Sequence, residues 1–181
     1  MPIKIFKEHT PQTLLIVGGA RSGKSSLAQK SAEFLGKKRI YVATAQAFDD
    51  EMKERIRLHQ QDRDSSWQTL EEPLNIADVI THRTCPDTVF LIDCLTLWLM
   101  NLMENGQDLF QAFAYLCAAL KKAKGTVILV SNETGLGIVP DSALSRRFRD
   151  EQGRLNQQVA SACEMVVFTV AGFPIVLKSA D

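Results

Sequence analysis

The chain has 181 residues, 45% of them hydrophobic, and its 21 lysines and arginines balance 21 aspartates and glutamates to a formal net charge of zero. This length suits a domain with a substantial core, and the even charge argues against nucleic-acid or membrane-surface binding, because both need a net basic face. No apolar run reaches membrane-spanning length, the first residues lack a signal-peptide core and no cysteines show C-x-x-C spacing, so we expect a cytoplasmic protein with reduced thiols.

Short apolar runs alternate with segments of helical periodicity along the chain. Residues 1–12 are polar and carry two prolines, so we expect an N-terminal arm followed by a single domain over residues 13–181. The predicted strands are Leu14–Val17, Lys38–Ala43, Trp67–Leu70, Thr88–Ile92, Thr126–Val130, Met165–Val170 and Ile175–Leu177. The predicted helices are Ser25–Leu35, Asp49–Gln61, Leu74–His82, Leu95–Met103, Leu109–Lys122 and Ser142–Ala162. This alternation predicts an α/β fold with a mostly parallel sheet and helices on both faces.

A glycine-rich turn lies between the first predicted strand and the first predicted helix. It matches G-x-x-x-x-G-K-[ST], the P-loop pattern, in which backbone N–H groups and a helix N-terminus bind a phosphate chain. The lysine of this pattern reaches the outer phosphates, and the serine after it offers its hydroxyl to Mg²⁺. The pattern predicts a P-loop NTPase-like catalytic domain whose nucleoside triphosphate contacts Gly18, Gly19, Ala20, Arg21, Ser22, Gly23, Lys24 and Ser25.

Further polar residues follow other predicted strands, at Thr44–Gln46, Asp93 and Ser131–Glu133. In parallel sheets ligands bind beyond the carboxyl ends of the strands, so we expect these residues near the P-loop. Asp93 follows Val-Phe-Leu-Ile, as the second acid of P-loop proteins does, and would hold Mg²⁺ with Ser25. Alternatively, Asp93 caps the helix predicted at Leu95, a common use of aspartate.

A histidine lies between two arginines in the predicted helix that starts at Asp49. Arg55, His59 and Arg63 recur every four residues and share one helix face. Two nearby cations disfavour protonation of an imidazole, and a neutral imidazole can attack phosphorus while the arginines hold the anion. The alternative is a solvated helix face on which His59 only packs, which spacing alone favours because charged helix faces are ordinary.

A series of motifs in fixed order makes the sequence more specific. The P-loop is followed by Tyr-Val-Ala-Thr-Ala (41–45), Arg-Ile-x-x-His (55–59), Asp-Cys-Leu-Thr-Leu-Trp-Leu-x-Asn-Leu (93–102) and Ser-Asn-Glu-Thr-Gly-x-Gly-Ile-Val-Pro (131–140). From about Leu14 to Lys178, the chain resembles the bifunctional adenosylcobinamide kinase / adenosylcobinamide-phosphate guanylyltransferase family of cobalamin biosynthesis.

The resemblance implies two reactions. The hydroxyl of adenosylcobinamide first takes the γ-phosphoryl group of ATP or GTP, and GTP then donates GMP to the new phosphate, which gives adenosylcobinamide-GDP and pyrophosphate. In this family the guanylyl group passes through the histidine of Arg-Ile-x-x-His, so the resemblance makes His59 the nucleophile, beside Lys24 as the second catalytic residue. The resemblance also implies a homotrimer, with the corrinoid between subunits.

Carried over by position, the family's nucleotide site adds residues that spacing could not identify. They are Thr44, Ala45, Gln46, Gln60, Gln61, Asp62, Arg63, Glu71 and Asp93. Arg146, Arg147, Arg149 and Arg154 either approach phosphates or form a solvated helix face paired with Asp150 and Glu151; we favour the solvated face. Two other functions remain open on the residues alone: a P-loop small-molecule kinase with a structural His59, and a nucleotide-dependent switch protein.

Overall fold

The structure is a computed structural model that describes residue 6 and residues 10–35, 38–46 and 64–179. Seven strands form one sheet in the order β3-β2-β4-β5-β1-β6-β7. The strands are β1 (Thr13–Gly18), β2 (Lys38–Ala43), β3 (Trp67–Glu71), β4 (Thr88–Asp93), β5 (Thr126–Asn132), β6 (Met165–Val170) and β7 (Phe173–Lys178). All neighbours pair in parallel except β6 and β7, which form an antiparallel hairpin.

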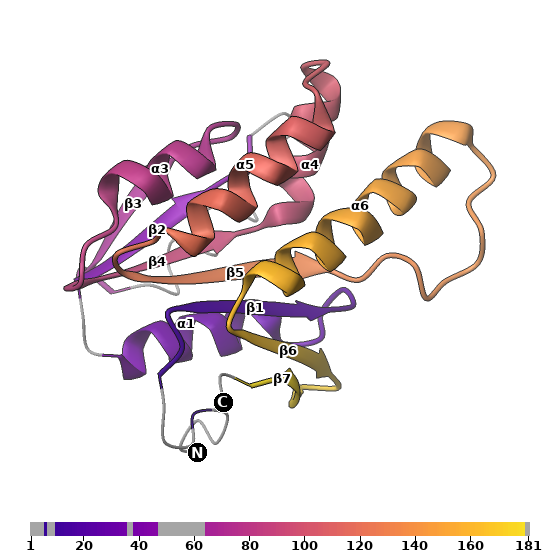
Figure 1. The fold of residues 1–181 in the computed structure, drawn as a ribbon. Coiled ribbons are helices and arrows are strands. Elements are labelled where there is room, and N and C mark those ends of the chain that lie inside the picture. The colour runs from indigo at the N-terminus through magenta and orange to yellow at the C-terminus, as the bar shows by residue number, and fades with distance from the viewer. Residues whose placement is uncertain (1–5, 7–9, 36–37, 47–63, 180–181) are drawn as a thin grey trace.

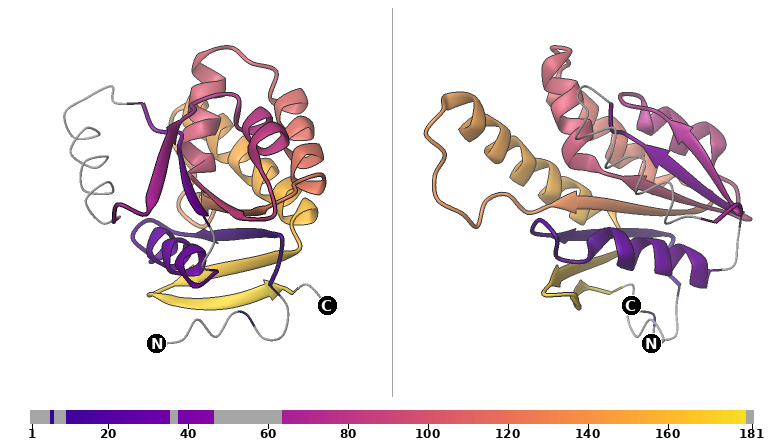
Figure 2. Two further views of the ribbon diagram at one scale, coloured as in Figure 1. Left: turned by 90° about the vertical axis from the view of Figure 1, so that its left-hand side faces the viewer. Right: turned by 180° about the vertical axis from the view of Figure 1, so that it is seen from behind.

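Helices cover both faces of the sheet. The helices are α1 (Lys24–Phe34), α3 (Ile76–Arg83), α4 (Leu95–Glu104), α5 (Leu109–Lys121) and α6 (Ala143–Ala162). Helix α1 packs on one face, and α3, α4, α5 and α6 pack on the other (Figures 1 and 2). The predicted α/β fold with a mostly parallel sheet is therefore confirmed.

The central strands are buried because both of their faces meet helices. Every residue of β1 is buried, as are the first five residues of β4 and the first six of β5. Alternate side chains enter two separate cores: Leu15 and Leu129 pack with α3–α6, whereas Ile16 and Val130 pack with α1. This alternation decides which residues at the strand ends share a face.

The predicted elements agree with the observed ones to within one or two residues at most ends. Helix α3 begins at Ile76 rather than at Leu74, because the Glu72 carboxylate accepts the N–H groups of Leu74 and Asn75 at 3.0 and 2.7 Å and holds them in a turn. The helix predicted at Asp49–Gln61 lies outside the described residues. Within the expected arm, Phe6 stacks on Phe34 with ring centroids 5.8 Å apart.

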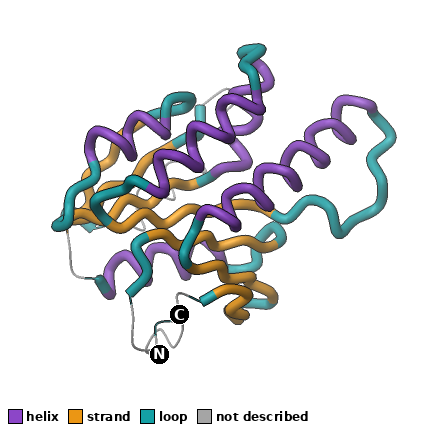
Figure 3. The backbone as a smooth tube through the Cα atoms, viewed as in Figure 1, coloured by secondary structure: helices purple, strands orange, loops and turns teal. Residues whose placement is uncertain are grey.

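The longest connection of the described chain joins β5 to α6 through residues 133–142 and extends away from the sheet (Figure 3). Helix α6 then begins after Ser142, whose hydroxyl accepts the Ser145 N–H at 3.0 Å. No helix of the described residues is long and apolar enough to cross a membrane.

Candidate functional site at the carboxyl edge of the sheet

The glycine-rich turn forms a tight loop between β1 and α1. The Ser22 N–H donates to the Gly19 carbonyl at 3.3 Å, and Gly23 adopts a left-handed conformation with φ of 97°. No side chain caps α1, so the N–H groups of its first turn face the loop without a side-chain acceptor. Such N–H groups, together with the positive end of the helix dipole, favour an anion at this position.

The hairpin of β6 and β7 supports this loop through contacts with Ser22. The Thr169 and Ser22 hydroxyl oxygens are 2.9 Å apart, and the Gly172 N–H donates to the Ser22 carbonyl at 3.1 Å. Ser22 is therefore held by both its side chain and its backbone. Ser22 is predicted to contact the nucleotide; in the structure its hydroxyl contacts Thr169 of β6 and so supports the loop.

Lys24 lies at the start of α1 and is only 7% exposed. Its ammonium group donates to the Gly19 carbonyl at 2.5 Å, so the side chain folds back over the loop. Burial lowers the pKa of Lys24, and the nearby Cys94 sulfur and Asp93 carboxylate oppose that shift. A buried cation facing a phosphate loop is well placed to bind the outer phosphates of a nucleotide.

Asp93 is the last residue of β4 and is half-buried. Strand alternation places it on the α1 face, because Val89 and Leu91 of the same strand pack in the α1 core. Helix α4 begins after Cys94, which is its N-cap residue, so Asp93 lies one position before the cap. The N-cap position that the alternative assigned to Asp93 is therefore held by Cys94, and the Asp93 carboxylate is close enough to Lys24 to oppose the fall in the Lys24 pKa that burial causes.

The Cys94 thiol lies beside these groups and is unreactive. Burial, together with the negative charge of Asp93, raises the pKa of Cys94 to about 12. The sulfur therefore stays protonated at neutral pH, and a protonated thiol is a poor nucleophile and metal ligand.

Thr44 follows β2 and is fully buried. Its hydroxyl donates to the Cys94 carbonyl and accepts the Cys94 N–H, both at 2.8 Å, while its own carbonyl accepts from the Asn101 amide at 2.8 Å. Asn101 also donates to the Pro73 carbonyl at 3.0 Å. Thr44 thus fixes the backbone next to Asp93, and Asn101 holds the segments that follow β2 and β3 together.

The structure brings most of the predicted residues to one edge. Gly18, Asp93 and Glu71 end their strands there, and Ala45 and Gln46 follow β2 at the same edge, half-buried. Glu71 is exposed and lies level with Ala43 in the strand register. His59 and the predicted nucleotide contacts Gln60, Gln61, Asp62 and Arg63 lie outside the described residues.

A buried polar cluster behind β5 could not be identified from spacing alone. The Gln152 amide donates to the Ser131 hydroxyl at 2.9 Å, and that hydroxyl donates to the Asn156 carboxamide oxygen at 2.6 Å. Gln152 and Asn156 lie four residues apart among the buried positions of α6. In the sequence, the indication of this cluster was two polar residues four positions apart within an apolar helix face.

The arginines of α6 behave as a solvated face. Arg149 pairs with Asp150 at 2.9 Å, Arg154 pairs with Glu151 at 2.6 Å, and Arg146 donates to the Pro140 and Asp141 carbonyls. The contacts of Arg149 and Arg154 agree with the paired-face interpretation, whereas Arg146 bonds to backbone carbonyls instead of an acid.

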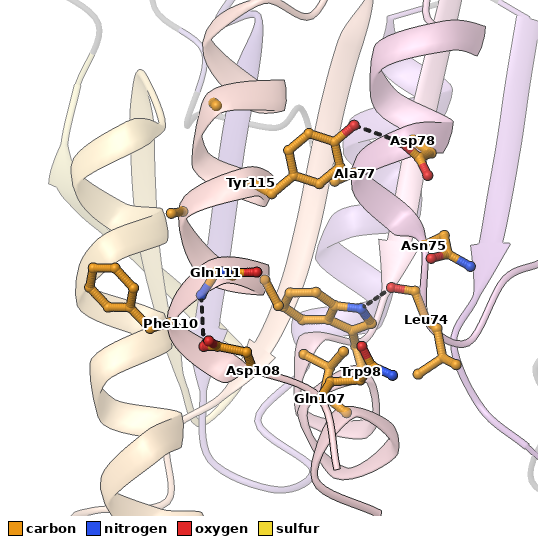
Figure 4. A pocket seen from close by; sticks show the side chains of 14 residues that line it. Leu74, Asn75, Ala77, Asp78, Trp98, Gln107, Asp108, Phe110, Gln111 and Tyr115 are labelled. Carbon is orange, nitrogen blue, oxygen red and sulfur yellow. Dashed lines mark hydrogen bonds between the residues drawn. The ribbon is translucent and has the colours of Figure 1, made fainter. Parts of the chain in front are cut away.

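A groove of about 630 Å³ lies away from the P-loop, between α3, α4 and α5 (Figure 4). The Trp98 ring forms part of its lining and donates its indole N–H to the Leu74 carbonyl at 2.7 Å. Its only charged lining residues are Asp78 and Asp108, so the groove has no cation for a phosphate. No group of three or more potential metal-ligating side chains gathers anywhere in the described part of the chain.

Comparisons with known proteins identify the family. The family model for cobinamide kinase / cobinamide phosphate guanyltransferase matches residues 14–177. The chain belongs to this family. It is 50% identical over 166 residues to the bifunctional adenosylcobalamin biosynthesis protein CobP of Pseudomonas aeruginosa, covering 91% of this chain and 96% of that protein. It is 38% identical over 183 residues to CobU of Escherichia coli strain K12, covering 91% and 99%.

Solved structures show the same fold at low identity. The RadB recombinase matches with a TM-score of 0.53 and 19% identity, covering 87% of this chain and 74% of that chain. A prototypical ATPase from the type III secretion system of pathogenic bacteria matches with a TM-score of 0.53 and 16% identity, covering 87% and 50%. At such identities the likeness shows the fold alone.

Proposed function

We propose that this enzyme phosphorylates adenosylcobinamide with ATP or GTP and then transfers GMP from GTP to the product, which gives adenosylcobinamide-GDP and pyrophosphate. Membership of the cobinamide kinase / cobinamide phosphate guanyltransferase family supports both activities. The observation that carries the proposal is the buried Lys24, which lies over the phosphate loop and next to Asp93. That arrangement provides one site for the triphosphate of both reactions.

Mg²⁺ fits the residues at this edge. The Asp93 carboxylate shares the α1 face with Ser25, the second residue of α1, and carboxylate and hydroxyl oxygens are ligands that Mg²⁺ accepts. We propose that Ser25 and Asp93 hold the ion, which when bound neutralises charge on the phosphate oxygens. Lys24 and the first N–H groups of α1 would bind the outer phosphates directly.

For the guanylyl transfer we propose His59 as the nucleophile. One imidazole nitrogen bonds to the α-phosphorus of GTP, the bond from that phosphorus to the α–β bridging oxygen breaks, and pyrophosphate leaves. A phosphate oxygen of adenosylcobinamide phosphate then attacks the same phosphorus and releases the histidine. The support is the Arg-Ile-x-x-His motif and its flanking arginines, Arg55 and Arg63.

We further propose a homotrimer located in the cytoplasm. Support for assembly comes from β7, where Phe173, Ile175, Val176 and Leu177 are all more than 40% exposed. Exposed apolar stretches of this kind typically mark contacts with other chains. Support for the location comes from four free cysteines, as expected in a reducing compartment.

Labelling with GTP that carries ³²P on the α-phosphate tests the proposal. We expect acid-labile, base-stable label on the protein, which is lost in His59→Ala and retained in His82→Ala. His82 is a matched control because it lies exposed in the last turn of α3. Lys24→Ala should lose both the label and the phosphorylation of adenosylcobinamide, because one site serves both reactions. Cobinamide phosphorylation without protein label would instead favour a simple kinase, and nucleotide-dependent partner binding without any transfer would favour a switch protein.

A further inference from the structure

The end of β5 lies between the two strands that carry the nucleotide-site residues. Its neighbours in the sheet are β4, which ends at Asp93, and β1, which ends at the P-loop. In the strand register Asp93 is level with Val130, and Gly18 is level with Asn132. Asn132 is therefore the residue of β5 that reaches the same edge as the first glycine of the loop.

Alternation along β5 assigns the face on which Asn132 lies. Val130 packs in the core on the α1 side, whereas the Ser131 hydroxyl faces α6 and bonds to Asn156. Asn132 therefore returns to the α1 face. This is the face shared by Asp93 and by Lys24 at the start of α1.

The backbone of Asn132 is fixed on both sides. Its N–H donates to the Thr96 hydroxyl at 2.9 Å, and its carbonyl accepts from the Asn156 amide at 3.0 Å. The next residue, Glu133, donates its N–H to the Gly18 carbonyl at 3.0 Å. Asn132 is thus anchored to α4, to α6 and, through its neighbour, to the P-loop.

In contrast, the side-chain carboxamide of Asn132 has no hydrogen-bond partner among the residues that the structure describes, although the residue is half-buried. The carboxamides of the buried Asn101 and Asn156 are both bonded within the protein. An unbonded side-chain amide on a fixed backbone segment at a phosphate-binding edge is a donor available to a ligand.

We propose that Asn132 is a further catalytic residue, whose carboxamide N–H donates to an oxygen of the γ-phosphoryl group. The inference rests on the kinase activity proposed above. In that step the acceptor hydroxyl oxygen bonds to the γ-phosphorus, the bond from that phosphorus to the β–γ bridging oxygen breaks, the nucleoside diphosphate leaves and the hydroxyl proton passes to solvent. Asn132 stabilises the charge on the transferred group, while Asn156 and Thr96 act as positioning residues.

Asn132→Ala tests the contact, with Asn75→Ala as the matched control, because Asn75 is exposed at the start of α3 and its side chain makes no capping bond. We expect Asn132→Ala to bind a non-hydrolysable GTP analogue about tenfold more weakly and GDP with less than a twofold change. Its kcat/KM for phosphoryl transfer from GTP to adenosylcobinamide should fall about 100-fold. Asn75→Ala should match the wild type in every measurement.

The possible results distinguish a failure of the Asn132 proposal from a failure of the kinase proposal. Equal loss of GDP and analogue binding, or wild-type affinity for both, would overturn the role of Asn132. A wild-type protein that phosphorylates no cobinamide would refute the kinase, but the analogue and GDP affinities would still decide whether Asn132 contacts the γ-phosphate. The unfolding midpoint of Asn132→Ala should equal that of the wild type, because its amide has no partner in the described residues; a lower midpoint would assign a structural role and refute the inference.

Discussion

Gly18 is the position where the phosphate loop tolerates no side chain. A methyl group added there would lie 2.5 Å from the backbone oxygen of Thr169, 2.5 Å from its hydroxyl oxygen and 2.7 Å from the Ser22 hydroxyl. These separations are roughly 1 Å shorter than an ordinary contact, and one of the atoms is the backbone of β6. The Gly18→Ala methyl can be accommodated only if β1 and β6 separate locally.

Overpacking of this kind costs about 2–3 kcal/mol of unfolding free energy, which for a chain of this size lowers Tm by roughly 4–12 °C. Gly19→Ala is the matched control, because a methyl group at that position meets nothing within 4 Å. Its unfolding free energy should stay within about 0.5 kcal/mol of the wild type. Urea denaturation followed by far-UV circular dichroism measures both variants.

Gly18→Ala should also weaken nucleotide binding, because the strand displacement moves the loop that it begins. Wild-type stability in Gly18→Ala, with an unchanged m-value, would refute the close approach of β1 to β6 as the reason for a glycine there. Equal destabilisation in both variants would show instead that any side chain in this loop is unfavourable, whatever its neighbours.

Two further predictions concern buried polar groups. Asn101→Leu leaves the Thr44 and Pro73 carbonyls without their amide donor, so the unfolding free energy measured in urea should fall by about 2–4 kcal/mol. The control Asn105→Ala removes a single hydrogen bond to the Asn101 carbonyl and should lower the unfolding free energy by about 1 kcal/mol. Burial raises the pKa of Cys163 to about 12, so its thiol should resist iodoacetamide at pH 8 while the exposed Cys85 reacts, as peptide mass spectrometry would show. Because this folded-state pKa lies above that of an unfolded thiol, the contribution of Cys163 to stability should be complete below about pH 8.5 and decline as pH rises toward 12; stability that increases over this range would contradict the assignment.

The sheet and most helix boundaries could be predicted because local signals suffice for them. Runs such as Thr88–Ile92 and Thr126–Val130 are apolar at every position after the first, which identifies strands buried on both faces. The phosphate loop is likewise encoded in consecutive residues. These features depend on neighbours in the sequence and need no knowledge of tertiary contacts.

The supporting contacts of the site depend on residues far apart in the sequence. Thr169 contacts Ser22 across 147 positions, and Asn101 bonds to Thr44 across 57. The spacing of residues in the sequence gave no reason to connect these pairs. Thr44 was expected to contact the nucleotide, and in the structure its hydroxyl and its carbonyl both bond within the protein. The sequence also left open whether Asp93 ends a strand or caps the next helix, two positions that differ by one residue. Only the residue at which α4 begins decided between them.

The strand order places the candidate residues for the two proposed reactions on either side of Asp93. Strand β4 lies between β2 and β5, so Asp93 separates two groups of candidate residues at the sheet edge. On one side are the P-loop and Asn132, which suit the γ-phosphate; on the other are the segments that follow β2 and β3, including Gln46 and Glu71. In the sequence, Gln46 precedes His59, the proposed nucleophile for the α-phosphorus, by 13 positions. Substitution of Asn132 should therefore impair phosphoryl transfer more than guanylyl transfer, and substitution of Gln46 or Glu71 should do the reverse. Substitution of Asp93, like that of Lys24, should impair both.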